Sequence, residues 1–252
     1  MRDFEDSTLW RISAFERMRN EGNTSSGFAR EDRTTVLPST LLADLDRLDA
    51  DLTGRDVLEV LAACLRHQES ALLYLAHEEL VWPVTLFPAQ SVYHCPRDMD
   101  DASTKGLAHL RLVDVEPPGV RPPGHWMHER IGHAEHYHPL TPLLWRVALY
   151  GPRSVLLSEI GGTAAYRALV SVASHGLIAP GAMGSAAERL HRESVSMREV
   201  AGWPGMSIER ASRVLNALYL ASSLMVTRTH PAARHQFGLG GGFSFGFRKP
   251  RR

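Results

Sequence analysis

Five histidines lie close together in a proline-rich stretch, and they are the residues whose chemistry is easiest to name: His125, His128, His133, His136 and His138. Neutral imidazoles bind Zn²⁺, Ni²⁺ and Cu²⁺ well, and three that converge on one point can form a metal site. Their spacing departs from the H-E-x-x-H pattern of a helical metal pair, because the histidine after His128-Glu129 is His133. We therefore predict loop histidines with no bound metal, and keep a histidine-cluster metal-binding protein as an alternative.

The sequence offers little support for covalent or cofactor chemistry. It contains neither G-x-S-x-G nor the phosphate-binding G-x-x-x-x-G-K-[ST], and Gly161-Gly162-Thr163 lacks the glycine spacing of a dinucleotide site. Cys64 falls on the apolar face of a predicted helix, which favours a place in the core. We predict a protein that is not an enzyme and that needs no cofactor.

The most clearly patterned stretch is residues 196–228. A short helix is followed by the turn Gly202-Trp203-Pro204-Gly205, and a longer helix then begins after Ser207, a good N-cap residue. A short apolar strand follows at residues 224–228. The order helix, turn, helix, strand is that of a winged helix, a scaffold used for both DNA binding and protein contact.

The candidate partner-binding residues lie on this unit: Trp203, Arg210, Arg213 and Arg228. A tryptophan between glycine and proline is either packed between the two helices or an interface hot spot. Arg210 and Arg213 are expected on the outward face early in the second helix, where they could reach a partner or DNA. From Ser196 onward, nine Lys and Arg outnumber two Asp and Glu. A winged-helix DNA-binding transcriptional regulator is therefore the first alternative.

The composition argues against several further classes of protein. The 28 basic and 28 acidic residues cancel, so no overall field attracts nucleic acid or anionic lipid. Two cysteines are too few for a disulfide framework, and no apolar run approaches the ~20 residues of a membrane span. The N-terminus also lacks a signal-peptide pattern. We expect a cytoplasmic protein without membrane contact.

The N-terminal half predicts helices that flank a small sheet. Residues 41–52 and 56–66 have helical periodicity, whereas four later runs have the alternation or aromatic content of strands: 70–75, 80–87, 91–94 and 107–115. We expect an antiparallel meander. Pro83 lacks a backbone donor, which predicts that its strand is an edge or contains a bulge.

Part of this pattern resembles a known family. The residues concerned are DVLEVL at 56–61, SALLYL at 70–75, VTLF at 84–87 and SVYH at 91–94. Together they resemble the PatA N-terminal, or PATAN, domain of bacterial signalling proteins, a family that tends to end in winged-helix-like helices. The resemblance implies a regulatory protein-interaction module with no chemistry of its own.

We predict an α+β fold in which a helix-flanked antiparallel sheet precedes a helical part ending in a winged helix. The helical part is expected to include helices at 154–160, 164–174 and 185–193. The expected regions are an N-terminal helix with a flexible linker (1–36), the sheet part (37–116), a Pro/His-rich extended connection (117–139), the helical part (140–230) and a disordered, basic Gly/Phe-rich tail (231–252). The expected function is a regulatory adaptor that binds protein partners in bacterial signalling, with a homodimer as one arrangement.

Overall fold

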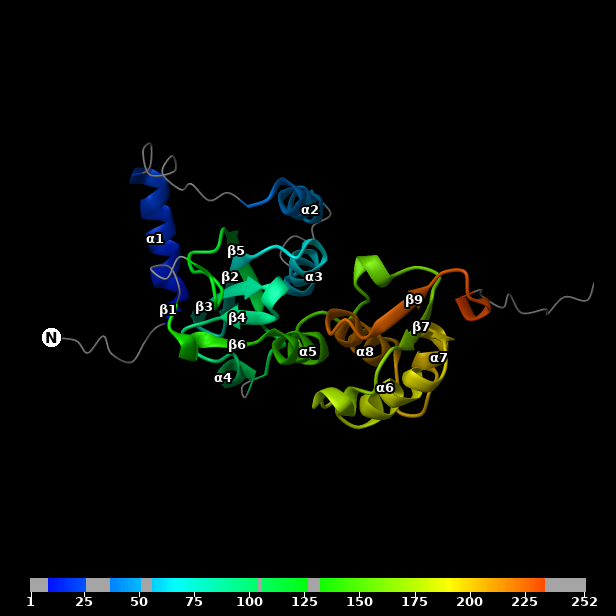
Figure 1. Cartoon of the computed structure of the whole chain (residues 1–252). Helices are drawn as coiled ribbons and strands as arrows, with labels where there is room; N and C mark the ends of the chain where they lie inside the picture. The colour runs from blue at the N-terminus through cyan, green and yellow to red at the C-terminus, as the bar shows by residue number, and fades with distance from the viewer. Residues whose placement is uncertain (1–8, 26–36, 51–55, 104–105, 127–131, 234–252) are drawn as a thin grey trace, which may run out of the picture.

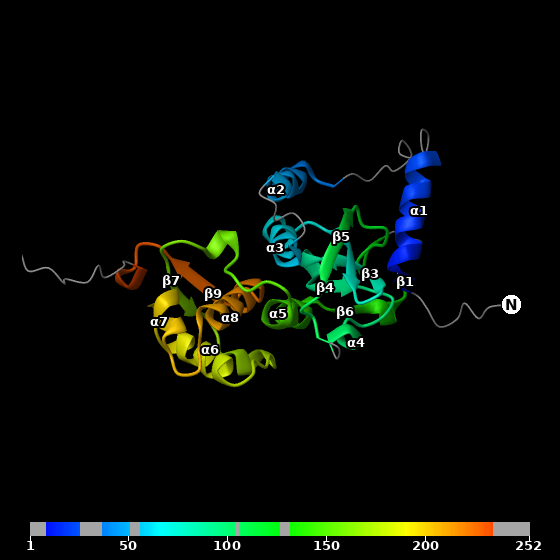
Figure 2. The same cartoon turned by 180° about the vertical axis from the view of Figure 1, so that it is seen from behind.

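The structure, a computed structural model, describes residues 9–25, 37–50, 56–103, 106–126 and 132–233 (Figure 1). The chain has an α+β fold with two antiparallel sheets, which confirms the predicted fold class. Most of the predicted linker and nearly all of the predicted tail lie outside the described residues. Figures 1 and 2 show helix α1 (Ile12–Ser25) at one end of the molecule and the smaller sheet at the other.

The larger sheet has the strand order β5-β2-β3-β4-β6, with the short β1 also paired to β3. Its strands are β1 (Trp10–Arg11), β2 (Ala71–His77), β3 (Leu80–Phe87), β4 (Val92–His94), β5 (Arg111–Glu116) and β6 (Tyr137–Pro139). The predicted meander is right for β2, β3 and β4, but β5 returns to the opposite edge and pairs with β2. This return is possible because residues 95–110, which contain α4 (Asp100–Ser103), are far longer than a hairpin turn.

Pro83 occupies a gap in the pairing of β3. On one side of β3, Leu80 and Val81 pair with β1, whereas Thr85 to Phe87 pair with β4. Pro83 itself is registered only against Tyr74 of β2. The strand is therefore a local edge at the proline, as its missing backbone donor predicts.

Helices cover both faces of the larger sheet. Helix α3 (Val57–His67) packs on one face and is covered in turn by α2 (Ser39–Ala50). Asp56 begins α3, because its Oδ1 accepts from the backbone N–H of Leu58 at 2.9 Å. On the other face, Phe15 of α1 packs with Tyr74 and Val81. The sheet thus has an apolar layer on each side.

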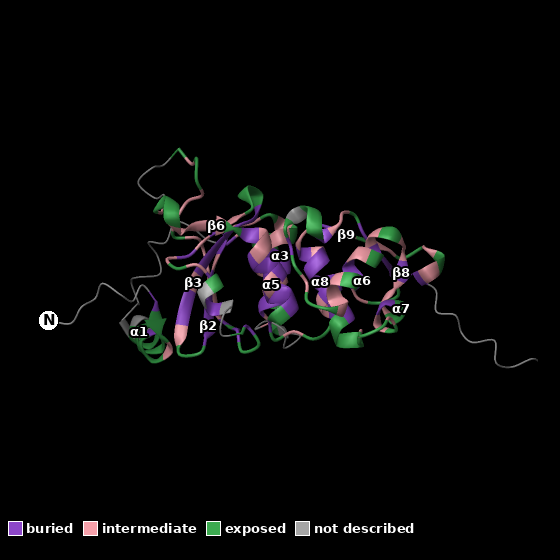
Figure 3. Ribbon diagram, turned by 90° about the horizontal axis from the view of Figure 1, so that it is seen from below, coloured by how far each residue is buried: buried purple, intermediate pink, exposed green. Residues whose placement is uncertain are grey.

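Helix α5 (Leu140–Tyr150) connects the two halves of the molecule. It packs along α8 (Ile208–Leu220) and also contacts α3, so one apolar core runs from the larger sheet into the helical part. Figure 3 shows buried residues throughout α3, α5 and α8 at the centre of the molecule.

The C-terminal part has the predicted order of helix, turn, helix and strand. Helix α6 (Ala182–Arg192) precedes α7 (Met197–Ala201), α8 and β9 (Leu224–Thr227). Ser196 and Glu199 form a capping box on α7, and Ser207 caps α8 by accepting from the N–H of Arg210 at 3.2 Å. Strand β9 joins β7 (Ala165–Ala168) and β8 (Val195–Ser196) in the order β8-β7-β9.

Three local predictions are wrong. Residues 164–174 contain β7 and the 3₁₀ helix η5 (Val172–His175), and only η4 (Ser158–Ile160) is helical within 154–160. The expected extended connection also ends in β6, which pairs with β4. Strands β6 and β7 each depend on partners far away in the sequence, so local patterns did not reveal them.

Among the described residues, no helix has both the length and the apolar character needed to span a membrane.

Candidate functional site

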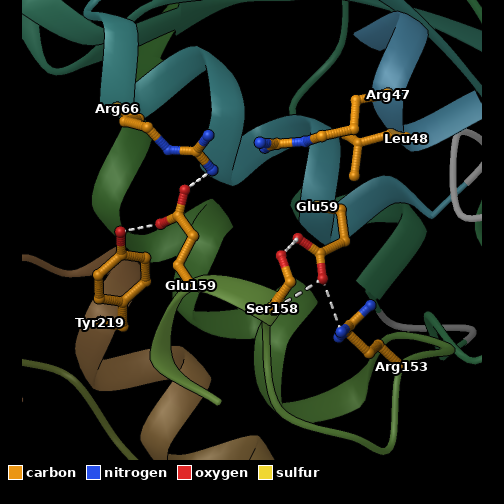
Figure 4. A pocket seen from close by; sticks show the side chains of 8 residues that line it. All are labelled: Arg47, Leu48, Glu59, Arg66, Arg153, Ser158, Glu159 and Tyr219. Atoms are coloured by element: carbon orange, nitrogen blue, oxygen red, sulfur yellow. Dashed lines mark hydrogen bonds and ion pairs between the residues drawn. The ribbon is translucent and has the colours of Figure 1, made fainter. Parts of the chain in front are cut away.

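A polar cavity of about 720 Å³ lies where α2 and α3 meet the segment after α5 and helix α8 (Figure 4). Three arginines, two glutamates, two hydroxyl groups and one leucine line it: Arg47, Leu48, Glu59, Arg66, Arg153, Ser158, Glu159 and Tyr219. Its volume is in the range of small-molecule sites, and it lies between the two halves of the chain. What the cavity can do depends on how these charges are paired.

Glu59 is the most deeply buried charge in the cavity wall, with 2% of its surface exposed. Its Oε1 lies 2.7 Å from Nη2 of Arg153. Ser158 donates to the same carboxylate from its backbone N–H at 2.9 Å and from its hydroxyl at 3.0 Å. Arg153 also pairs with Asp56, the residue that caps α3. These contacts offset the cost of burying the charges.

A second group of charges lies around Arg66 and Glu159. Arg66 pairs with Glu159 and with Asp44, and the hydroxyl of Tyr219 donates to Glu159. Burial alone would raise the pKa of Asp44, but its hydrogen bond with His67 and the charges of Arg66 and Arg47 lower that pKa below its ordinary value. Burial raises the pKa of Tyr219, which keeps its hydroxyl protonated as a donor.

Arg47 lies at the open side of the cavity. Its side chain is 61% exposed, its guanidinium extends into the cavity in Figure 4, and it pairs with Asp44 at 3.0 Å. Each carboxylate of the lining already has a guanidinium partner, so neither is free to act as a base. These ion pairs therefore hold α2 and α3 against the C-terminal part of the chain.

Two of the predicted contact residues are Trp203, in the turn between α7 and α8, and Arg210, in the first turn of α8. Trp203 is partly buried, and the guanidinium carbon of Arg189 lies 4.4 Å from the centre of its ring. Arg210 is exposed, and its guanidinium donates to the carbonyl of Gly205. These contacts hold the side chains of Trp203 and Arg210 in place against the neighbouring chain.

The other two predicted contact residues have structural partners. Arg213 has 15% of its side chain exposed and donates to the carbonyls of Leu149 at 3.1 Å and Gly151 at 2.8 Å. The prediction that Arg213 faces outward is wrong, because the free carbonyls at the end of α5 attract its guanidinium. Arg228 donates to the carbonyls of Gly161 and Glu159 at 2.9 and 3.0 Å.

Helix α8 is enclosed along most of its length. From Ala211 to Leu220, every residue is buried except Arg213 and Tyr219, which are partly buried. Asn216 is fully buried and bonds to the segment after α5, donating to the carbonyl of Val155 and accepting from the N–H of Leu157, both at 2.9 Å. Only the first turn is exposed, where Ile208 shows 70% of its surface.

The structure brings together only part of the histidine cluster. The ring centre of His136 lies 5.6 Å from that of His133 and 5.7 Å from that of His94. His138 packs on Tyr93, His125 stacks on Trp126, and His128 lies outside the described residues. Within the described part of the chain, no group of three or more His, Cys, Asp or Glu side chains could hold a metal ion.

His94 is the member of the cluster that sequence reasoning missed. It lies on β4, in register with Tyr137 of β6, so only strand pairing places it beside His136. Burial, and then the charges of His136, His138 and His133, lower its pKa from 6.5 to about 4. His94 is therefore neutral at neutral pH.

The cavity residues were missed as well. The one available signal was Glu59, a lone acid within the apolar run Val57-Leu58-Glu59-Val60-Leu61. A charge at such a position needs a buried partner, but the sequence does not show that the partner is Arg153, 94 residues away.

No family model, no curated protein and no solved structure matches this chain. Its function must therefore be argued from its own residues.

Proposed function

We propose that this protein is a non-enzymatic regulatory adaptor, similar to PATAN domains of bacterial signalling, that binds a protein partner in the cytoplasm. The observation that carries the proposal is the exposed surface at the start of α8. We define this contact surface as Trp203, Pro204, Ile208 and Arg210. The remainder of α8 is enclosed by other parts of the chain, so this surface is where α8 meets solvent.

The composition of the contact surface suits a protein partner. Ile208 exposes 70% of a large apolar side chain. Trp203 is held beneath Arg189, and Arg210 is anchored to the carbonyl of Gly205. Tryptophan and arginine are enriched among interface hot spots, and residues that are already ordered lose little entropy on binding.

The geometry argues against the DNA-binding alternative. A recognition helix needs an exposed face to enter the major groove, whereas α8 is covered by α5 and by the segment after it. Glu209 is exposed beside Arg210 and would repel phosphates. Arg213 and Arg228 are already engaged with backbone carbonyls.

The resemblance to PATAN domains also supports an adaptor. The segments that carry the resemblance fall on α3, β2, β3 and β4, which follow one another along the chain.

The polar cavity also supports a non-enzymatic role, because the carboxylates that line it are paired with arginines and neither is placed as a free catalytic group.

The test compares partner capture with DNA binding. The wild type, Ile208→Asp and Met18→Asp are immobilised and exposed to extract from the source organism. Met18 is a matched control because it is also exposed, at 47%, but lies on α1 at the other end of the molecule. A protein retained by the wild type and by Met18→Asp, but lost with Ile208→Asp, supports the proposal.

The wild type, Arg210→Ala and a variant with serine in place of the cations after residue 247 are titrated with random-sequence duplex DNA across a salt series. Tight binding that weakens steeply with salt and is lost in Arg210→Ala would overturn the adaptor proposal in favour of DNA binding. Binding that depends only on the cations after residue 247 would not involve the contact surface.

A further inference from the structure

Strand β9 is an edge of the smaller sheet and lacks the features that usually protect an edge. Its residues are Leu224, Met225, Val226 and Thr227, with no charge and no proline. Edge strands are normally blunted by charges, prolines, bulges or short length, because their unpaired backbone groups can recruit another strand.

The other sheet edges have these features. Strand β5 carries Arg111, Asp114 and Glu116 and has a register shift against β2. Strand β6 ends at Pro139, and β8 has only two residues. Among the strands that the structure describes, the edge of β9 is therefore the one best suited to accept a further strand.

Exposed apolar side chains lie beside this edge. Met225 is 40% exposed and Leu169, directly after β7, is 51% exposed. Arg167 is in register with Met225, and Leu169 follows two residues later, so the alternation of strands places these side chains on one face of the sheet. The opposite face, with Leu224 and Val226, packs on the apolar core.

We propose that residues 243–247 of this same chain dock on β9 as a fourth strand of the smaller sheet. Their sequence is Phe-Ser-Phe-Gly-Phe, an alternation with the period of a strand. The three phenylalanines would share one face and cover Met225 and Leu169, while the small serine and glycine would face the other way. Backbone pairing with β9 would satisfy its open edge.

The chain between is long enough for this docking. The last described element, η6 (Pro231–Ala233), contacts β7 and β8. Adjacent strands are ~4.8 Å apart, so the outer side of β9 is on the order of 10 to 15 Å from there. Ten residue steps separate Ala233 from Phe243, and an extended chain covers ~3.3 Å per residue. Four of the intervening residues are glycine, which allows a tight return.

Hydrogen exchange of the β9 amides tests the proposal directly. The full chain is compared with Phe243→Ser/Phe245→Ser/Phe247→Ser. The matched control is Lys249→Ser/Arg251→Ser/Arg252→Ser, which changes the same number of tail residues without touching the phenylalanines. For the β9 amides that point away from β7, we expect exchange at least tenfold faster in the phenylalanine variant and unchanged in the control.

Two results would overturn the proposal. Equal exchange rates in the full chain and the phenylalanine variant would mean that the tail does not cover β9. Protection that rises with protein concentration, together with a dimeric mass in light scattering, would assign the edge to a second copy. Neither experiment involves a partner protein, so their results do not test the adaptor proposal, which has its own experiment.

Discussion

At the scale of single residues, the pair Glu59–Arg153 is the interaction with the largest expected effect on stability. Both side chains are nearly buried, at 3% and 8% exposure, and removing the Glu59 charge leaves the buried Arg153 with Asp56 as its remaining carboxylate partner. We expect Glu59→Gln to lower the free energy of unfolding by about 3 to 5 kcal/mol, measured by urea denaturation.

The matched control for this prediction is Glu193→Gln. Glu193 pairs with Arg189 on the surface, with side chains 42% and 52% exposed. Exposed pairs contribute about 0 to 1 kcal/mol, so this variant should unfold almost as the wild type does. Equal losses in the two variants would show that burial does not decide the strength of the Glu59 pair.

His94 should make stability depend on pH. Its pKa is about 4 in the folded protein, below the ordinary 6.5, so the unfolded chain takes up the proton first. Above pH 6.5 both states are neutral and His94 has no effect; between pH 6.5 and 4 the folded state loses stability progressively. Between pH 7.5 and 4.5, we expect the melting temperature of His94→Gln to fall less than that of the wild type. Parallel curves for the two proteins would contradict this role.

At the scale of elements, the start of α8 depends on one side chain. Ser207 accepts from the N–H of Arg210, and replacing an N-cap serine by alanine typically costs ~1 kcal/mol. We expect Ser207→Ala to lower stability by about that amount in a denaturant titration. Ser154→Ala, at an exposed position outside any helix, is the control. A loss of the same size in the control would exclude a capping effect.

Local patterns predicted the elements that depend on neighbours in the sequence. The helices around Val57 and Ile208 and the turn at Pro204 follow from capping residues, apolar periodicity and glycine or proline breaks. Strand β7 was mistaken for a helix because its short run becomes a strand only when β9 and β8 pair with it. The placement of β5 beside β2 likewise depends on a long connection.

At the scale of the whole molecule, the two sheets share one apolar core. The largest buried cluster continues from Leu73 of the larger sheet through Leu144 of α5 to Leu218 of α8. We expect a single calorimetric unfolding transition whose van't Hoff and calorimetric enthalpies agree. Two separate transitions would show that α5 does not couple the halves.

The sequence by itself determined the α+β class, the helices that begin after Asp56 and Ser207, and the helix-turn-helix order. These follow from the chemistry of each residue and the next few along the chain. The tertiary structure alone decided that Arg213 binds the end of α5, that α8 is enclosed, that His94 joins His136, and that Glu59 meets Arg153. Each of these contacts joins segments distant in the sequence, and burial, which sets the energy of such charges, exists only once the chain has folded.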